Sequence, residues 1–264
     1  MIMTRGSRIG VLLGVTTAAV AAVCFLPPIP QDPAYHRFAD TRAVGRMPNG
    51  WAVLSNLPFV LVGLWGLRQA LTAPAGASAP FVESRERWAY ALFFAGVALT
   101  GVGSAFYHWA PDNARLVWDR LPMTIGFMAF LAAIVSERVS VTAGIALLPV
   151  LLVAGAGSVV YWYAGERVGA GDLRPYALVQ FAPLVLILTM LWLFPARYTH
   201  GGYLVAVMVI YGAAKAAEIL DGQIFSMGHV LSGHTLKHLT AALAAWWLLL
   251  GLAVRRPVAA EEAT

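Results

Sequence analysis

The chain is 264 residues long and too apolar for an ordinary soluble protein, because 59% of its residues are hydrophobic and only 12% are charged, against roughly 25% charged in a typical soluble domain. Its formal net charge of +5 comes from 18 basic and 13 acidic residues. The basic residues form no stripe interleaved with aromatic residues, so we do not expect nucleic acid as a partner. The single cysteine, Cys24, excludes an intramolecular disulfide framework and a cysteine-based zinc site. The composition predicts a polytopic membrane protein.

Eight segments have the length and composition of membrane-spanning helices. A helix needs about 20 mostly apolar residues to cross a bilayer core of about 30 Å. The predicted spans are residues 9–27, 51–71, 88–109, 118–136, 141–163, 176–195, 203–220 and 233–253. The connectors contain turn-forming proline, glycine and aspartate residues, and the alternating pattern of barrel strands is absent. The predicted fold class is therefore all-α, a polytopic membrane helix bundle.

The first span, residues 9–27, has two interpretations. Arg5 and Arg8 before an apolar run are typical of a signal peptide. However, no small-x-small cleavage site lies before Pro27 and the run is long enough to span, so we expect a retained helix, as an extra span or signal anchor. With a cytoplasmic N-terminus, nine arginines lie on the inner side, counting Arg68 near the inner end of the second span, and six lie on the outer side. This excess predicts that orientation, in the cell (inner) membrane if the protein is bacterial.

Five polar residues gather at one predicted membrane depth. An ionisable side chain is costly in hydrocarbon, so such a group calls for a functional explanation. The five are Ser104 and His108 at the end of the third span, Asp119 at the start of the fourth, and His234 and His238 in the first turns of the eighth. Because the third span ends on the outer side and the fourth and eighth begin there, we expect all five near the non-cytoplasmic face.

The spacing of these residues indicates metal chemistry. Residues four apart share a face of a helix, so His234 and His238 can bind one metal ion, and His108 could complete a three-histidine set. Zinc with three protein ligands keeps its fourth position for water and lowers the pKa of that water toward about 7. Asp119 is then the candidate general base and acid. Ser104, one turn before His108, is the candidate hydrogen-bond donor to an oxyanion.

Each of these residues also has a structural interpretation. A histidine near a helix end is often an interfacial or capping residue, Asp119 could be a helix N-cap, and Ser104 could permit close helix packing beside glycines. The histidines of the eighth span could also ligate haem or only form hydrogen bonds. The shared depth of all five favours one common site, and three histidines with a carboxylate suit zinc better than haem.

Other ionisable residues in or near the spans need separate accounts. Lys215 and Glu218 are three apart in the seventh span, and we expect them to neutralise each other. Asp221 ends that span and is expected to cap a loop or to support the metal site. Lys237 lies about one turn from its helix end rather than mid-membrane, which argues against a retinal Schiff base. We expect no role for the loop histidines His36, His200 and His229.

The motifs that carry these residues resemble those of the alkaline ceramidase family. They are Gly-x-Gly-Ser-x-x-Tyr-His at 101–108, Asp-Arg-Leu-Pro-Met at 119–123 and His-x-x-x-His at 234–238. The pair Ser55-Asn56 and the stretch 221–225 are also similar to the family. The resemblance covers roughly residues 32–253. The family belongs to a superfamily of seven-helix membrane hydrolases that also includes receptors of the adiponectin and progestin type.

The resemblance implies a fold and an activity. Residues 31–254 would form a seven-helix ceramidase-like membrane domain, with 1–30 as an additional hydrophobic helix and 255–264 as a short tail. Zinc would be held by His108, His234 and His238, with Asp119 as the catalytic aspartate and Ser104 as the family serine. The implied reaction is hydrolysis of the amide of ceramide, or of a related lipid, to a sphingoid base and a fatty acid.

Two implications of the resemblance are less direct. Some superfamily members are receptors, so the alternative function is a lipid-sensing, receptor-like protein with structural zinc. The eukaryotic enzymes also place an acidic calcium site before the first core helix. Here the matching stretch, residues 35–42, has few carboxylates, and Asp32 and Asp40 are the remaining candidate calcium ligands.

Overall fold

Eight helical segments of the described chain are long and apolar enough to cross a membrane, which confirms the predicted all-α bundle. The computed structural model describes residues 3–258. The long helices are α1 (Arg5–Phe25), α3 (Leu57–Thr72), α4 (Arg87–Trp109), α5 (Asn113–Arg138), α6 (Val141–Glu166), α7 (Arg174–Leu193), α8 (Gly202–Ile219) and α10 (Gly233–Val254). Shorter helices are η1 (Pro33–His36), α2 (Gly50–Leu54), η2 (Ser84–Glu86) and α9 (Asp221–Ser226). The chain is an integral multi-pass membrane protein.

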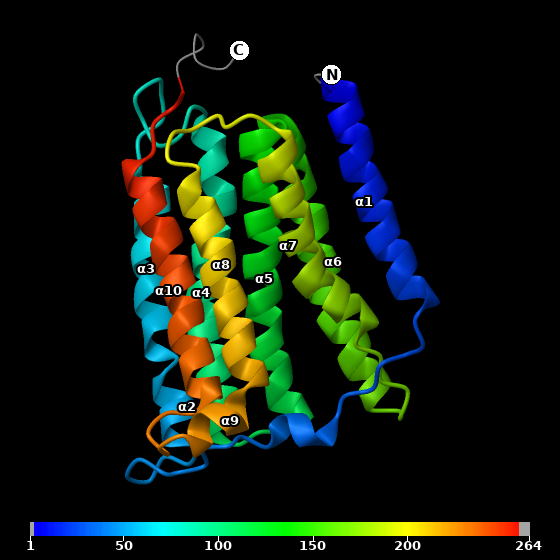
Figure 1. The fold of residues 1–264 in the computed structure, drawn as a ribbon, viewed down its shortest axis with the longest axis vertical. Helices are drawn as coiled ribbons and strands as arrows, with labels where there is room; N and C mark the ends of the chain where they lie inside the picture. Colours follow the sequence, from blue (N-terminus) through cyan, green and yellow to red (C-terminus); the bar gives the residue numbers. More distant parts are fainter. Residues whose placement is uncertain (1–2, 259–264) are drawn as a thin grey trace.

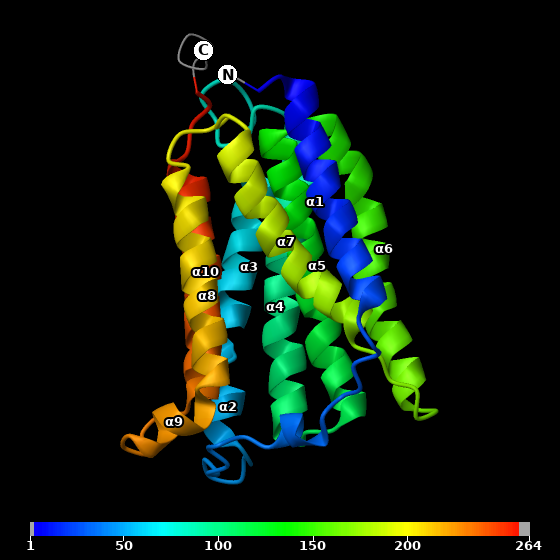
Figure 2. The same ribbon diagram turned by 45° about the vertical axis from the view of Figure 1, so that its right-hand side comes forward.

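The helices α3 to α8 and α10 form the bundle, and α1 lies outside it (Figure 1). Helix α5 packs against α4, α6 and α7, and most of its hydrophobic side chains are buried. Helix α1 has no buried residue and contacts α7, as the turned view also indicates (Figure 2). Helix α1 begins and α10 ends at one end of the bundle, whereas α2 and α9 lie at the opposite end. This second end contains the candidate site.

The second span is broken, although the sequence predicts a continuous helix over residues 51–71. Helix α2 ends at Leu54 and α3 begins at Leu57. The side chains of Ser55 and Asn56 both donate to the carbonyl oxygen of Ala52, at 3.2 and 2.7 Å. Pro58 lacks the N–H group that would continue the helical hydrogen bonds, so the helix restarts at this point.

The fourth span begins earlier than predicted, which changes the position of Asp119. Helix α5 starts at Asn113 rather than at 118, and its N-cap is Asp112, whose Oδ1 accepts from the backbone N–H of Arg115 at 2.7 Å. The alternative that Asp119 is a helix N-cap is therefore wrong, because Asp112 has this role. Asp119 is a buried residue inside the helix.

Helices α4 and α5 approach closely beside the site. A Cβ atom added at Gly103 would overlap the carbonyl oxygen of Trp118. In a regular helix this carbonyl would accept from the N–H group of residue 122, but that residue is Pro122 and has no N–H. Glycine at 103 therefore lets α4 approach the exposed part of the α5 backbone. The close approach brings the turn of Ser104 alongside the turn of Asp119.

Candidate metal centre

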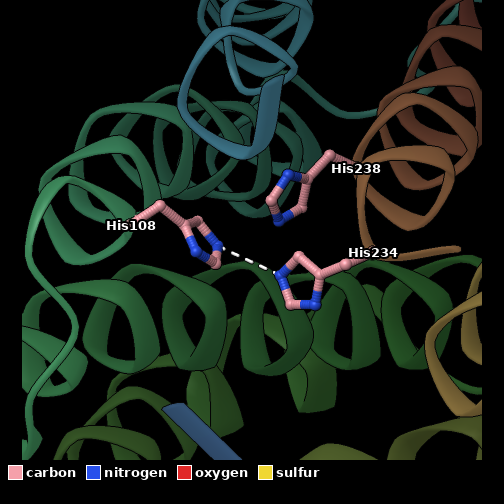
Figure 3. A group of neighbouring side chains, drawn as sticks. All are labelled: His108, His234 and His238. Carbon is pink, nitrogen blue, oxygen red and sulfur yellow. Dashed lines mark hydrogen bonds between the residues drawn. The ribbon is translucent and has the colours of Figure 1, made fainter. Parts of the chain in front are cut away.

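His108, His234 and His238 lie together inside the bundle, as the sequence predicts (Figure 3). None of the three is more than 7% exposed. Their ring centroids are 4.7 to 4.9 Å apart, and one nitrogen of each ring lies within 4.8 Å of the others. Within residues 3–258, this is the one group of three or more His, Cys, Asp or Glu side chains with ligand atoms this close.

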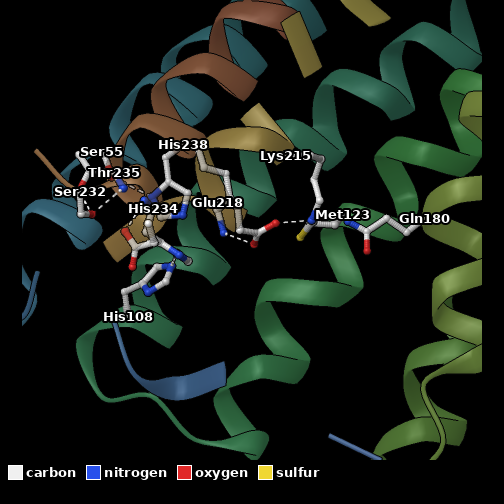
Figure 4. Close-up of polar contacts among 12 residues, drawn as sticks. Ser55, His108, Met123, Gln180, Lys215, Glu218, Ser232, His234, Thr235 and His238 are labelled. Carbon is white, nitrogen blue, oxygen red and sulfur yellow. Dashed lines mark hydrogen bonds and ion pairs between the residues drawn. The ribbon is translucent and has the colours of Figure 1, made fainter. Parts of the chain in front are cut away.

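The fold fixes His238 through the break between α2 and α3. Its Nδ1 lies 2.8 Å from Oγ of Ser55 (Figure 4). Because the Ser55 hydroxyl donates its proton to the Ala52 carbonyl, its oxygen accepts from His238, which assigns the ring proton to Nδ1. The lone pair of Nε2 is then free to bind a metal ion, and Nε2 is buried without a hydrogen-bond partner in the described chain.

His234 is held at the start of α10 by local capping. Oγ of Ser232 accepts from the backbone N–H of Thr235 at 3.1 Å and begins the helix. The backbone N–H of His234 donates to Oδ1 of Asp221 at 2.7 Å, and Oδ2 of the same carboxylate accepts from the Ala39 N–H at 2.9 Å. Asp221 thus supports the site as expected, through the backbone of His234 rather than through its ring.

Contacts from the loop before α2 fix His108 at the end of α4. Asn49, with a positive φ of 48°, donates from Nδ2 to the carbonyl oxygen of His108 at 2.9 Å. This bond satisfies one of the last carbonyls of α4. The ring of Phe38 packs against the rings of His108 and His234, each at 4.7 Å between centroids. The loop therefore covers the centre with an apolar ring that limits the access of water.

The separation of His108 and His234 fits two ligands of one tetrahedral metal ion. His108 Nε2 and His234 Nε2 are 3.2 Å apart. Two nitrogen ligands on one tetrahedral zinc ion lie about 3.3 Å apart, given metal–nitrogen distances of about 2.0–2.1 Å. The same separation is too short for His108 and His234 to bind a haem iron from opposite faces, because such imidazole nitrogens lie roughly 4 Å apart with the porphyrin between them. The cluster can hold a metal ion, and imidazole ligands are compatible with several transition metals.

Ser104 and Asp119 line the same cavity as His238. This cavity has a volume of about 70 Å³. Both side chains are buried, at 3% and 7% exposed. The predicted catalytic pair therefore lies together with one of the predicted metal ligands. The carboxylate and the hydroxyl face a space large enough for water and a small polar group.

An apolar cavity of about 130 Å³ adjoins the polar one. The two share several lining residues, which are Phe59, Thr100, Met123, Tyr211 and Ala241. The rest of its lining is almost entirely hydrophobic, with Phe93, Phe127 and Phe130 among its residues. The site thus has a polar compartment beside the histidines and an apolar compartment toward the middle of the bundle.

The remaining sequence candidates lie apart from this centre. His36 bonds through its ring nitrogens to Tyr107 Oη and Asn113 Oδ1, each at 2.9 Å. His200 bonds to Thr199, and the ring of His229 contacts that of Phe225 edge to face, so neither joins the cluster. No role was expected for these three residues.

The two candidate calcium ligands are each engaged by the protein. Oδ1 of Asp32 accepts from the Ala34 N–H at 2.8 Å. Both carboxylate oxygens of Asp40 accept from the Arg42 guanidinium, at 2.8 and 2.7 Å. These hydrogen bonds from Arg42 lower the pKa of Asp40 below its usual value. A calcium ion at Asp40 would have to displace an arginine, so the residues present do not fit a calcium site.

Two residues of the site were not assigned a role from the sequence. Ser55 orients His238, and Lys237 lines the polar cavity. The signal for Ser55 was available, because a Ser-Asn pair followed by Pro58 interrupts an otherwise apolar span.

Comparison of the chain with models of known protein families and with curated proteins finds no match. The motifs and the geometry of the site are therefore the observations that bear on function.

Proposed function

We propose that this chain is a zinc-dependent membrane amidase that hydrolyses ceramide or a related lipid amide. The observation that carries the proposal is the three-histidine cluster beside a polar cavity lined by Asp119 and Ser104. The resemblance of the same residues to the alkaline ceramidase motifs supports the choice of an amide as the bond that is cleaved. The adjoining apolar cavity supports a lipid substrate.

The residues of the cavity divide the reaction among them. A zinc ion on the three histidines would supply a water molecule of lowered pKa and would polarise the amide carbonyl group. Asp119 accepts a proton from the attacking water and later delivers it to the leaving nitrogen. Ser104 donates a hydrogen bond to the oxygen of the carbonyl group as negative charge develops there.

The two compartments explain why such a site would lie inside a membrane bundle. The acyl chain occupies the apolar cavity, where Phe93, Phe127 and Phe130 remove it from water. The amide then lies at the boundary with the polar cavity, next to Asp119 and Ser104. Water reaches the site from the end of the bundle at α2 and α9, which is the non-cytoplasmic end in the orientation predicted from the arginines.

The proposal is tested by incubating the purified full-length protein with a panel of lipid amides and measuring released fatty acid by mass spectrometry. We expect release by the wild type that stops after metal chelation and returns when zinc is added. The receptor-like alternative predicts that lipid binds and is recovered intact. Wild-type protein that contains zinc but releases no fatty acid from any amide would contradict the amidase proposal.

A further inference from the structure

Both lysines of the chain lie at one carboxylate inside the bundle. Of the 18 basic residues in the sequence, only Lys215 and Lys237 are lysines. Lys215 on α8 forms an ion pair with Oε2 of Glu218 one turn later (Figure 4), and Nζ of Lys237 on α10 lies 2.9 Å from Oε1 of the same carboxylate. We call these three residues the lysine cluster. All three are largely buried, with side chains 16% to 27% exposed.

The lysine cluster contains one more positive than negative charge. Each oxygen of Glu218 faces one ammonium group, so two cations share one anion. Within residues 3–258, neither lysine forms an ion pair with a second acidic residue. Each ammonium has three N–H donors and uses one of them on Glu218. Within the cluster, one ammonium group therefore has no carboxylate of its own, and an anion bound there would supply one.

The lysine cluster forms one wall of the polar cavity. Lys215, Glu218 and Lys237 line the same space as Ser104, Asp119 and His238. Asp119 is the other acidic residue of this cavity, and it makes no ion pair with either lysine in the described chain. The free N–H donors of the lysines are therefore close to the place where the proposed reaction positions the amide. A substrate group attached near the amide nitrogen would meet them.

We infer that the lysine cluster binds a carboxylate of the substrate, so that the preferred substrate is an N-acyl amino acid rather than an uncharged ceramide. This inference rests on the proposed amidase function and specifies its substrate. The single positive charge that Glu218 leaves unpaired in the cluster matches a carboxylate, whereas a phosphate carries about −1.5 to −2. A cavity of about 70 Å³ also suits a small head group better than a large one.

The inferred reaction is a hydrolysis that needs only water. The carbonyl carbon of the amide gains the hydroxyl group of water and its C–N bond breaks. The leaving nitrogen gains the proton, through Asp119. The products are a fatty acid and an amino acid. During this reaction the carboxylate of the amino acid part remains bound to the lysine cluster, which fixes the position of the amide relative to Asp119 and Ser104.

Equilibrium binding of two matched lipids tests the inference independently of turnover. N-oleoylglycine and N-oleoylethanolamine have the same acyl chain and the same amide. The first carries a carboxylate where the second carries a hydroxymethyl group. Binding of each labelled lipid to the full-length protein in detergent is measured after removal of divalent metal ions, so that hydrolysis does not deplete the ligand. We expect N-oleoylglycine to bind at least roughly tenfold more tightly, as for a charge-assisted contact in a buried site.

Variants of the lysine cluster make the test specific. Lys215→Met leaves Glu218 paired with Lys237 and removes the excess charge, so it should fold and lose the preference for N-oleoylglycine. Lys237→Met should also lose the preference, because Glu218 then pairs with Lys215 alone. Lys237→Arg, which keeps the charge, should retain much of the preference. Arg46→Met, which removes an exposed positive charge from the loop before α2, is the control and should keep the preference.

The outcomes separate this inference from the proposed function. Equal binding of the two lipids, or an unchanged preference in both lysine variants, overturns the inference even if uncharged amides are hydrolysed. Binding of oleate as tight as that of N-oleoylglycine also overturns it, because the recognised carboxylate would then belong to the product. Tighter binding of an N-acyl aminoalkyl phosphate than of N-oleoylglycine would contradict the choice of a carboxylate. Selective binding without hydrolysis supports the inference and contradicts the amidase function.

Discussion

The hydroxyl oxygen of Ser55 lies 2.8 Å from Nδ1 of His238 and 3.2 Å from the carbonyl oxygen of Ala52. The serine therefore connects the break in the second span to a predicted metal ligand on the last helix. It fixes the ring proton on Nδ1 and leaves Nε2 facing the other two histidines. Groups that orient a ligand histidine in this way typically increase metal affinity by about 10–100-fold.

Ser55→Ala is expected to weaken zinc binding by about 10–100-fold without preventing folding. Zinc affinity can be measured by competition with a chelator of known affinity. The matched control is Ser158→Ala on α6, because the Ser158 hydroxyl also donates to a helix carbonyl, that of Gly155 at 2.7 Å, and contacts none of the three histidines. Equal zinc affinity in the two variants would show that the contact between Ser55 and His238 does not orient the ligand.

Asp119→Asn is expected to keep its zinc and to lose turnover by roughly 10²–10⁴-fold, because the amide side chain cannot accept and return the proton. Asp119 belongs to the cavity and not to the three-histidine cluster. Zinc content and fatty acid release are measured on the same preparation. Loss of zinc together with activity would instead assign Asp119 a role in holding the metal.

Gly103→Ala is expected to move α4 away from α5 and to reduce activity and thermal stability together. The added Cβ would overlap the Trp118 carbonyl oxygen, and overpacking of this kind typically costs about 1–3 kcal/mol. The control is Gly126→Ala on α5, where an added Cβ meets no atom within 4 Å. We expect the control to melt at the same or a slightly higher temperature, since alanine is the better helix former. Identical melting curves for the two variants would argue against the close approach.

Arg255→Met is expected to destabilise the bundle at the end opposite the site. Arg255 Nη1 lies 2.9 Å from Glu137 Oε2 and 2.8 Å from Tyr90 Oη, and the guanidinium stacks 4.1 Å from the centroid of the Tyr198 ring. Removing one partner of a buried ion pair typically costs roughly 3–5 kcal/mol. Thermal unfolding in detergent measures the effect. The neighbouring Arg256→Met is the control, because Arg256 is exposed, and a similar loss in both variants would refute the role of the buried pair.

The fold and the histidine cluster were predictable because their signals are local. Apolar runs of about 20 residues identify spans. The spacing of His234 and His238 places both rings on one helix face, and chain direction alone brings His108 to the same end of the bundle. These inferences need only helix geometry and the alternation of spans across the membrane.

The parts that the sequence did not predict depend on packing between helices. Lys237 is 19 residues from Glu218, and their contact follows from how α8 packs on α10. The predicted fourth span begins at 118, five residues after the start of α5 at Asn113, whose N-cap is Asp112. Ser55 lies in the break between α2 and α3, and its contact with His238 depends on how these helices pack against α10.

Metal analysis of the purified full-length protein tests whether the three-histidine cluster binds zinc. We expect one zinc ion per chain in the wild type and a loss of that zinc in His108→Ala, His234→Ala and His238→Ala. His200→Ala, a variant of a histidine outside the cluster, should keep it. Full zinc content in the three cluster variants, or a correctly folded wild type that takes up no zinc when it is supplied, would contradict the account.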